Sequence, residues 1–403
     1  MNLIDIPNFI NTYITKRQES LFAKDIEANR ELLTDRIQGK SVLVIGGAGT
    51  IGSSYIRAIL QFKPSKLYVV DTNENGLTEL TRQLRSDANM YMPEDYKTYP
   101  MNFGDAVFEK MFKAEGPFHI VANFAAHKHV RSEKDKYSIE AMIDNNVFKA
   151  KAFLDLLVEH KPERFFCVST DKAANPVNVM GASKKLMEET IMAYSDTLQI
   201  TTARFANVAF SNGSLLAGYI ERLFKNQPIS CPADVKRFFV SPEESGQICM
   251  LACMLGESSD IYFPKLEEEE MAYFKEITLD FFKASNRQIL ECSTEVEAKQ
   301  MALKLTDQDP YPVFFFKSDT SGEKLYEEFY TDSDVVDMLT HDSLGVVKNA
   351  RKLALGDIES TIEELKTLMD SGDYDKAKIV SALKKHLPDF EHIETGKSLD
   401  QKM

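Results

Sequence analysis

Short apolar runs alternate along the chain with longer segments in which apolar residues recur every three or four positions. Five runs have the length and composition of buried strands and span residues 41–45, 66–71, 119–126, 164–170 and 201–210. The segments between them show helical spacing, as after Gly52 and in residues 78–86. Strands that are apolar on both faces need helices on both sides, which is typical of a parallel sheet. The pattern therefore predicts an α/β fold with a Rossmann-type, doubly wound parallel sheet.

The composition indicates a large globular chain with an acidic balance. The 403 residues carry a formal net charge of −14, which would repel the phosphates of nucleic acid, so no nucleic-acid partner is expected. The five cysteines are scattered, which favours neither a metal site nor a disulfide framework and fits a reducing, cytoplasmic location. The chain starts without a signal-peptide pattern and has no run of about 18 apolar residues, so no membrane span is expected.

A glycine-rich turn follows the first predicted strand. Gly46, Gly49 and Gly52 are three residues apart, and a helix that begins near Thr50 and Ile51 would direct backbone N–H groups and its positive dipole end at a pyrophosphate. Asp71 ends the next strand, 19 residues after Gly52, where an acid accepts hydrogen bonds from ribose hydroxyls and repels a 2′-phosphate. The alternative is a strand–turn–helix with incidental glycines. Because the spacing and the acid occur together, we expect NAD.

Polar residues gather where the predicted strand 164–170 ends. Thr170, Asp171 and Lys172 follow the strand directly, and Lys184 lies on the helix that comes after a proline-containing turn. Ligands bind at the carboxyl ends of parallel strands, so these groups should lie together near a bound nicotinamide. Outside this context, Asp171 and Lys172 would be read as a surface ion pair before a turn.

Six motifs together resemble the extended short-chain dehydrogenases/reductases, specifically the CapD/FlaA-like UDP-N-acetylglucosamine 4,6-dehydratases. They are GGAGTIG (46–52), AAHKHV (125–130), STDKAANPVNVMGASK (169–184), RFANVAFSNGS (204–214), KRFFVSPEE (236–244) and GEKLYEE (322–328). One departure stands out: the family's usual Tyr-x-x-x-Lys has Met180 in place of tyrosine, four residues before Lys184. This resembles the large, configuration-retaining relatives. Methionine is neither acid nor base, so an inactive enzyme is an alternative.

The resemblance implies a three-step reaction on a nucleotide-activated hexose, with UDP-N-acetylglucosamine as the expected substrate, for bacterial surface polysaccharide or glycan synthesis. Hydride leaves sugar C4 for NAD, water is lost across C5 and C6, and the hydride returns to C6 to give a 4-keto-6-deoxy sugar. Lys172 is the candidate base at C5 and Asp171 the candidate acid at C6. For the C4 hydroxyl proton, two routes stay open: Thr170 with Lys184, or Asp171. The competing functions are a 4-epimerase or C4 reductase, and a non-catalytic NAD- or sugar-nucleotide-binding regulator.

The resemblance also assigns binding residues. Toward NAD it adds Asn73, Asp105, Ala125, Ala126, Lys128, Asn145 and Lys184 to the glycine turn and Asp71. Toward the substrate it places Lys128, Asn207, Ser211, Asn212, Arg237 and Glu323. Arg237 would clamp a phosphate, since a guanidinium pairs bidentately with phosphate oxygens. Relatives usually have Arg and Pro just before the glycine that is Gly322 here, but this chain has Asp319, Thr320 and Ser321. UDP is therefore the default nucleotide of the substrate, while GDP and CDP stay open.

Four segments are predicted from these patterns. Residues 1–38 form a helical lead-in and residues 39–205 the NAD-binding Rossmann domain. Residues 206–332 form a smaller substrate lobe, with the chain crossing between lobes, and residues 333–403 form a helical extension. The resemblance implies a homodimer or higher homo-oligomer, with the helices of residues 139–160 and 183–196 pairing in a four-helix bundle.

Overall fold

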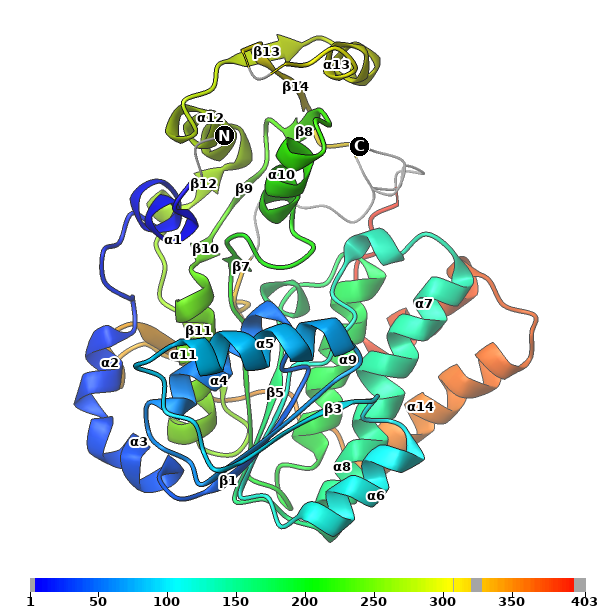
Figure 1. Ribbon diagram of the computed structural model, residues 1–403. Helices are drawn as coiled ribbons and strands as arrows, with labels where there is room; N and C mark the ends of the chain where they lie inside the picture. The colour runs from blue at the N-terminus through cyan, green and yellow to red at the C-terminus, as the bar shows by residue number, and fades with distance from the viewer. Residues whose placement is uncertain (1–3, 307, 320–327, 395–403) are drawn as a thin grey trace.

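A nine-stranded sheet forms the centre of the computed structural model, which describes residues 4–306, 308–319 and 328–394 (Figure 1). Its strand order is β15-β16-β11-β6-β5-β4-β1-β2-β3. The first six strands along the chain are β1 (Ser41–Ile45), β2 (Lys66–Asp71), β3 (Asp95–Pro100), β4 (Ile120–Asn123), β5 (Arg164–Val168) and β6 (Ile200–Ala203). All six are parallel and lie in the order 3-2-1-4-5-6 of doubly wound dinucleotide-binding sheets. The predicted fold class is confirmed.

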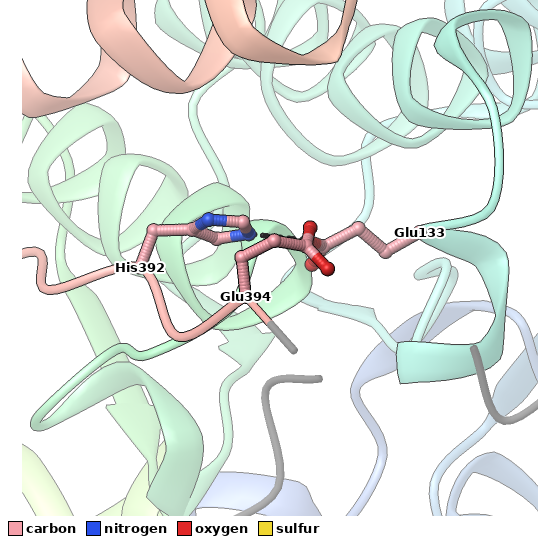
Figure 2. A group of neighbouring side chains, drawn as sticks. All are labelled: Glu133, His392 and Glu394. Atoms are coloured by element: carbon pink, nitrogen blue, oxygen red, sulfur yellow. Dashed lines mark hydrogen bonds and ion pairs between the residues drawn. The ribbon is translucent and has the colours of Figure 1, made fainter. Parts of the chain in front are cut away.

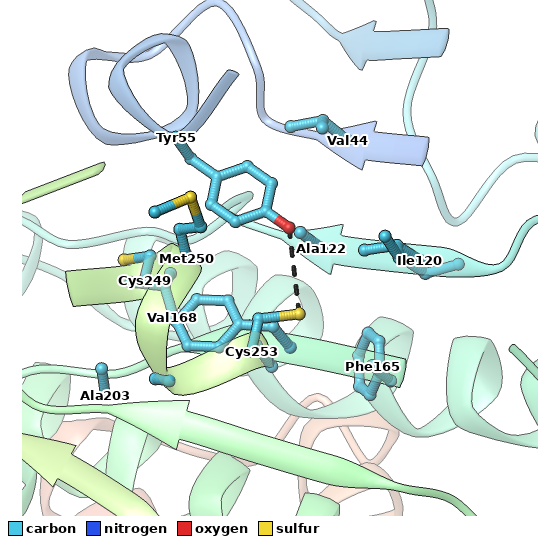
Figure 3. Packing of buried hydrophobic residues seen from close by; sticks show 14 of the residues in the cluster. Val44, Tyr55, Ile120, Ala122, Phe165, Val168, Ala203, Cys249, Met250 and Cys253 are labelled. Carbon is cyan, nitrogen blue, oxygen red and sulfur yellow. Dashed lines mark hydrogen bonds between the residues drawn. The ribbon is translucent and has the colours of Figure 1, made fainter. Parts of the chain in front are cut away.

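Helices cover both faces of this sheet. The helices are α4 (Thr50–Leu60), α5 (Glu74–Ser86), α6 (Ala106–Glu115), α8 (Lys149–Glu159), α9 (Val179–Ala193) and α11 (Pro242–Leu255). α4 packs against α11 on one face, and α8 packs against α9 on the other (Figure 1). Figure 3 shows the core on the α4 side, where the buried Tyr55 hydroxyl donates to Cys253 Sγ at 3.8 Å. Strands apolar on both faces are thus explained by burial from both sides.

Later segments extend the same sheet. β11 (Ile261–Pro264) pairs in parallel with β6, and β16 (Leu344–Val347) and β15 (Val336–Asp337) add two antiparallel strands. The extension predicted to be helical from residue 333 therefore begins with two strands. The reason is the short apolar run of residues 344–347, which is buried between β11 and β15. Its backbone N–H and C=O groups find hydrogen-bond partners by pairing with these two strands. Helices follow only from residue 355 onward.

A smaller lobe stands beyond the carboxyl ends of the parallel strands. Its strands are β7 (Asn207–Val208), β8 (Ile229–Pro232), β9 (Lys236–Arg237), β10 (Phe239–Val240), β12 (Ala272–Tyr273), β13 (Ile289–Cys292) and β14 (Tyr311–Phe316). Its helices are α10 (Leu215–Phe224), η5 (Glu268–Glu270), α12 (Phe274–Ala284) and α13 (Glu295–Ala302). A separate parallel sheet consists of β13, β14 and β8, and α12 and α13 pack against it at the top of Figure 1.

The amino-terminal segment packs along one side of the molecule. It consists of α1 (Ile6–Phe9), the π-helix η1 (Ile10–Ile14), α2 (Ala23–Ala28) and α3 (Arg30–Ile37). Phe9 is buried in the apolar cluster of the smaller lobe, at 5.7 Å between ring centroids from Phe281. Arg17 donates from Nε and Nη2 to the two carboxylate oxygens of the buried Glu244 on α11, at 3.0 and 3.1 Å. The lead-in is therefore an integral part of the fold.

The carboxyl-terminal helices cover a second side. α14 (Leu355–Asp370) and α15 (Lys376–His386) pack on α7 (Lys136–Ile143), the π-helix η3 (Asp144–Phe148) and α9. In the segments 139–160 and 183–196, which were expected to pair in a four-helix bundle, the apolar residues Ile139, Ile143, Val147 and Leu186 pack in one cluster with the chain's own α14 and α15. The short helices η2 (Val130–Ser132) and η4 (Asp171–Ala173) complete the fold. Among the described residues, no helix combines the length and the apolar character needed to cross a membrane.

Candidate functional site

The glycine turn connects β1 to α4 in a geometry that side chains would not permit. Gly46 has φ of +75°, and a Cβ there would lie 2.6 Å from the backbone nitrogen of Ala125. A Cβ at Gly52 would lie 2.3 Å from Gly46 O. The helix therefore begins directly behind the turn, with Gly49 as its N-cap and its first backbone N–H groups at the end of the sheet.

A cavity of about 270 Å³, here called the glycine-turn pocket, opens at this turn. Most of the predicted cofactor residues line it: Gly46, Gly49, Thr50, Ile51, Gly52, Asp71, Ala125, Ala126, Lys128 and Asn145. The Asp71 carboxylate is oriented by two backbone groups, with Ala48 N donating to Oδ2 at 3.0 Å and Asn73 N donating to Oδ1 at 2.9 Å. An acid held in this way at the end of β2 suits a ribose diol.

Three predicted cofactor residues do not line this pocket, and one of them, Lys184, lines the second cavity described below. The Asn73 side chain caps α5 by accepting from Gly76 N at 2.9 Å, and Asp105 is an exposed residue at the start of α6. The pocket is lined instead by residues that the sequence reasoning missed, namely Thr72, Met101, Asn102, Phe103 and His127. Met101, Asn102 and Phe103 follow β3 directly, so the rule that ligands bind at strand carboxyl ends could have found them once β3 was recognised.

A second cavity of about 230 Å³, the Asp171–Lys172 pocket, adjoins the first. Ile51, Phe124, Ala126 and Lys128 line both cavities. All five predicted catalytic residues line the second: Thr170, Asp171, Lys172, Met180 and Lys184. Asn207 and Ser211 lie there as predicted, together with the unpredicted His129, Phe205, Ala206, Gly213 and Ser214. The fold therefore brings the candidate chemistry next to the candidate cofactor site.

Three donors converge on one oxygen of Asp171. Its Oδ1 accepts from the Thr170 hydroxyl at 2.8 Å, from Lys172 N at 2.9 Å and from Lys172 Nζ at 3.0 Å. Asp171 is buried, and the Lys172 side chain is 19% exposed. An ammonium and a carboxylate in direct contact, with a hydroxyl beside them, can pass a proton between two neighbouring substrate atoms.

Lys184 and Met180 face the same pocket from α9. Both are almost fully buried. Lys184 Nζ donates to Val168 O at 2.6 Å, and burial lowers the pKa of this lysine. The direct hydrogen bond of Thr170 is to Asp171, which favours the carboxylate over Lys184 as its immediate partner.

A buried ion pair between Glu188 and Arg204 holds Ser169, the residue that follows β5. Ser169 Oγ donates to Glu188 Oε1 at 2.6 Å, while Arg204 donates to both Glu188 oxygens at 2.9 and 2.7 Å. Burial disfavours the charged form of Glu188, but the Arg204 charge outweighs it and lowers the pKa of this carboxyl. Thr170 and Asp171 follow Ser169 directly, so the pair supports their position.

Polar contacts also connect the two pockets. Lys128 Nζ donates to Asn212 O at 3.3 Å, and Asn212 N donates to Thr50 Oγ1 at 2.9 Å. Burial lowers the pKa of Lys128. Asn146, which the sequence reasoning passed over, accepts from His127 N at 2.8 Å and donates to Ser183 on α9 at 3.0 Å.

Two of the predicted substrate residues, Asn212 and Arg237, do not line the Asp171–Lys172 pocket. Asn212 lines a groove over α4 and α5, although its backbone touches Lys128 and Thr50. Arg237 is buried on β9 and donates from Nη1 to Lys236 O at 2.9 Å. Glu323 lies outside the described residues.

Comparison with known proteins places this site in a family. Residues 42–349 match the family described as "Polysaccharide biosynthesis protein". The chain belongs to this family. The chain combines the glycine turn with the 169–184 segment, as the CapD/FlaA-like extended short-chain dehydrogenases/reductases do. It is of that type, as the resemblance predicted.

Three curated relatives show the range of similarity. The uncharacterized membrane protein MJ1061 of Methanocaldococcus jannaschii is 28% identical over 314 residues, which cover 76% of this chain and 85% of that protein. The probable polysaccharide biosynthesis protein EpsC of Bacillus subtilis is 26% identical over 79% of this chain, which spans 50% of EpsC. A UDP-N-acetylglucosamine 4,6-dehydratase (inverting) of Campylobacter jejuni is 26% identical over 57% of this chain and 67% of that enzyme.

Solved structures share the fold of this polysaccharide biosynthesis family member. Pen from Bacillus thuringiensis superimposes with a TM-score of 0.63 at 21% identity, covering 79% of this chain and 91% of Pen. The dTDP-glucose 4,6-dehydratase DesIV from Streptomyces venezuelae, whose structure contains NAD and TYD, has a TM-score of 0.53 at 18% identity over 72% of this chain and 88% of DesIV. Identities this low establish the architecture alone.

Proposed function

We propose that this protein dehydrates a nucleotide-activated hexose to its 4-keto-6-deoxy derivative with bound NAD, and that the substrate is UDP-N-acetylglucosamine. The observation that carries the proposal is the contact between Asp171 and Lys172, a carboxylate and an ammonium 3.0 Å apart in the pocket that adjoins the glycine turn. Oxidation or epimerisation at C4 needs one acid–base group, whereas loss of water across C5 and C6 needs a base and an acid side by side.

The glycine-turn pocket fits NAD in shape and charge. The close approach of Gly46 and Gly52 leaves the start of α4 open to a pyrophosphate, and Asp71 offers acceptors for ribose hydroxyls. The same carboxylate would repel a 2′-phosphate, which supports NAD over NADP. When bound, NAD accepts a hydride from the sugar and later returns it. DesIV, with the same architecture, was crystallised with NAD.

The chain's own residues would then move the protons. Once C4 is a ketone, the C5 proton is acidic, and Lys172 Nζ removes it as an uncharged amine. Asp171, which holds the proton from the C4 hydroxyl, protonates the departing C6 hydroxyl, which leaves as water; the 3.0 Å contact keeps this acid and base side by side. Lys172 returns a proton to C5 when the hydride returns to C6, and exchange of the Lys172 protons with solvent before that return brings deuterium to C5.

The C4 hydroxyl proton needs another acceptor, because Met180 stands where the usual tyrosine would be. The Thr170 hydroxyl already donates to Asp171 Oδ1, so it can take the sugar proton as it passes its own to the carboxylate. Lys184, held by Val168 O, contributes a buried charge close to C4 and the nicotinamide ribose. This arrangement supports Asp171 as the final acceptor of the C4 proton, reached through Thr170, and so combines parts of the two routes considered above.

The substrate would span both pockets. Lys128, which lines both, would contact the cofactor and the sugar, and Asn207 and Ser211 would border the diphosphate. Arg237 and Glu323 remain proposed nucleotide contacts. The product would supply polysaccharide or glycan synthesis, in keeping with the family. The cytoplasmic location and the homo-oligomer remain predictions; an oligomer would have to use a face other than the one that α14 and α15 cover.

The decisive experiment incubates the purified protein with UDP-N-acetylglucosamine in deuterated water and follows the product by proton NMR and mass spectrometry. We expect a product lighter by one water, with a 6-methyl signal and deuterium at C5. Lys172→Gln should abolish deuterium incorporation. A matched control is Lys225→Gln, since Lys225 is an exposed lysine that also pairs with a carboxylate, Glu221, at 3.6 Å.

Each alternative function predicts a different result. A C4 epimer or C4-reduced sugar without loss of water would replace the dehydratase by an epimerase or reductase. Tight binding without turnover of UDP-, GDP- and CDP-sugars, and indifference to Lys172→Gln, would indicate a regulator. Turnover of the GDP- or CDP-sugar alone would keep the reaction and change the nucleotide. The coupling constant of the C5 proton, measured in ordinary water, separates retaining from inverting chemistry.

A further inference from the structure

The carboxyl-terminal segment returns to the beginning of the catalytic helix. α14 and α15 bury an apolar cluster against α7, η3 and α9, to which α9 contributes Val179, Ala182 and Leu186. After α15 the chain runs back toward the turn before α9, where Ile393 N donates to Val177 O at 2.9 Å. The last described residues thus lie beside the start of the helix that carries Met180 and Lys184.

Glu133 joins this returning segment to α9. One carboxylate oxygen, Oε2, accepts from Val179 N at 2.6 Å. The other, Oε1, contacts His392 Nε2 at 2.5 Å (Figure 2). The same oxygen lies 3.0 Å from Lys376 Nζ. The Glu133 and His392 side chains are 5% and 8% exposed, so the contact is shielded from water. His392 and Lys376 both belong to the carboxyl-terminal segment.

Glu133 and His392, together with Glu394, have the ligand types of a metal site, since they offer ligand atoms within 4.8 Å of one another. Lys376 decides against it. Its ammonium lies 3.0 Å from Glu133 and 2.5 Å from Glu394, and so already supplies the positive charge between the two carboxylates. The cluster is therefore an ion-pair network, and Glu133 connects this network to α9 by accepting a hydrogen bond from Val179 N.

The start of α9 has little freedom to move without disturbing the catalytic loop. Asn178 accepts from Gly181 N at 2.7 Å and caps the helix, while a Cβ on Gly181 would lie 2.7 Å from Lys172 O. The first turn of the helix is thus packed directly on the residue proposed as the C5 base. Amides in a first helical turn have no partner within the helix, so the Glu133 carboxylate fixes one that would otherwise be unsatisfied.

We propose that Glu133 is a positioning residue for the catalytic helix, and that His392 and Lys376 of the carboxyl-terminal segment hold it in place. The segment of residues 376–394 is therefore required for full turnover, although none of its residues lines the Asp171–Lys172 pocket. The inference rests on the proposed function, since it concerns the placement of Lys172 and Lys184. Small displacements of catalytic groups lower turnover more than binding.

The test compares Glu133→Gln and His392→Ala with a matched control in the contact between α14 and α15. Glu364→Gln is that control, because Glu364 also accepts from a histidine and a lysine, His386 at 3.0 Å and Lys385 at 2.7 Å, without touching α9. We expect kcat to fall about 10-fold in Glu133→Gln and about 3- to 10-fold in His392→Ala, with KM and NAD affinity within about twofold of the wild type. Glu364→Gln should keep wild-type kcat, and His392→Gln, which can still donate to Glu133, should recover most of it.

A second measurement does not depend on turnover. Hydrogen exchange of the amides of residues 179–184, followed by mass spectrometry on the full chain, should accelerate in Glu133→Gln and His392→Ala but not in Glu364→Gln. Exchange and kcat that match the control in both variants would overturn the proposal. If the wild-type protein shows no dehydratase activity, the proposed function fails, while the exchange data still decide whether Glu133 positions α9. If Glu133→Gln does not fold, the two His392 variants decide.

Discussion

Replacing Gly52 by alanine should destabilise the fold and weaken NAD binding together. The new Cβ would stand 2.3 Å from Gly46 O and 2.8 Å from Gly47 Cα, and both are backbone atoms that cannot rotate away. The start of α4 must therefore retreat from the turn by about 1 Å. Overpacking of this kind costs about 1–3 kcal/mol of unfolding free energy.

The same movement displaces the backbone N–H groups at the start of α4. Hydrogen bonds to a charged group contribute about 1.5–3 kcal/mol each. The loss of one such bond to a phosphate, at about 1.4 kcal/mol per tenfold, corresponds to a 10- to 100-fold weaker affinity for NAD. We expect Gly52→Ala to fall in this range.

Two further glycines separate stability from binding. At Gly49 the nearest atom to a Cβ is Gly46 O at 3.4 Å, so Gly49→Ala should change stability by less than about 0.5 kcal/mol. Its methyl group would enter the glycine-turn pocket and lower NAD affinity by about 10-fold or more. At Gly356 on α14 nothing lies within 4 Å, so Gly356→Ala should stabilise the protein by about 0.5–1 kcal/mol and leave NAD binding unchanged.

Urea denaturation gives the three unfolding free energies, and titration with NAD followed by calorimetry gives the affinities. The reasoning is refuted if Gly52→Ala binds NAD as the wild type does, or if Gly49→Ala loses as much stability as Gly52→Ala. It is also refuted if Gly356→Ala weakens NAD binding, because that glycine lies outside both pockets.

Three more substitutions test the catalytic pocket and its support. Lys184→Met should lower turnover about 10²- to 10⁴-fold and block the first step, so neither C5 deuterium nor NADH absorbance appears, whereas Lys172→Gln should still show NADH. Glu188→Gln removes the nearer of the two carboxylates that pair with the buried Arg204, leaving Asp334 at 3.7 Å, and should cost about 3–5 kcal/mol in urea denaturation; a loss under about 1 kcal/mol would contradict the ion pair's supporting role. Burial raises the pKa of Glu189 to about 7 from 4.5, so the native state holds a proton that the unfolded chain has released. Stability should therefore fall as pH rises from about 4.5 to 7, and Glu189→Gln, measured by thermal unfolding across this range, should remove the slope.

The local chemistry of this protein could be predicted because it resides in contiguous segments. The turn 46–52 and the segment 169–184 each contain a strand end, a turn and a helix start, so their glycines, acids and lysines lie near one another in any fold that forms those elements. Periodicity then gave the sheet class, since strands apolar on both faces require helices on both sides.

Longer connections were predicted less well. Residues 101–103 line the glycine-turn pocket, but β3, which precedes them, has the half-polar sequence DYKTYP and is not recognisable as a buried strand. β16 is a four-residue apolar run that became an antiparallel strand only because β11 offered it an edge. Asn73 and Asp105 were assigned to the cofactor by analogy, yet neither lines the glycine-turn pocket: the Asn73 side chain caps α5, and Asp105 lies at the start of α6.

The sequence by itself determined the Rossmann sheet, the glycine turn with Asp71, and the grouping of Thr170, Asp171 and Lys172. These features depend on periodicity and on short-range spacing, which any reader of the chain can measure. Only the tertiary structure decided that α14 and α15 cover α7 and α9. It also decided that Glu133 connects Val179 to His392, which lies 259 residues after Glu133 in the chain. Contacts between such distant residues arise from the packing of whole elements, and no local pattern encodes them.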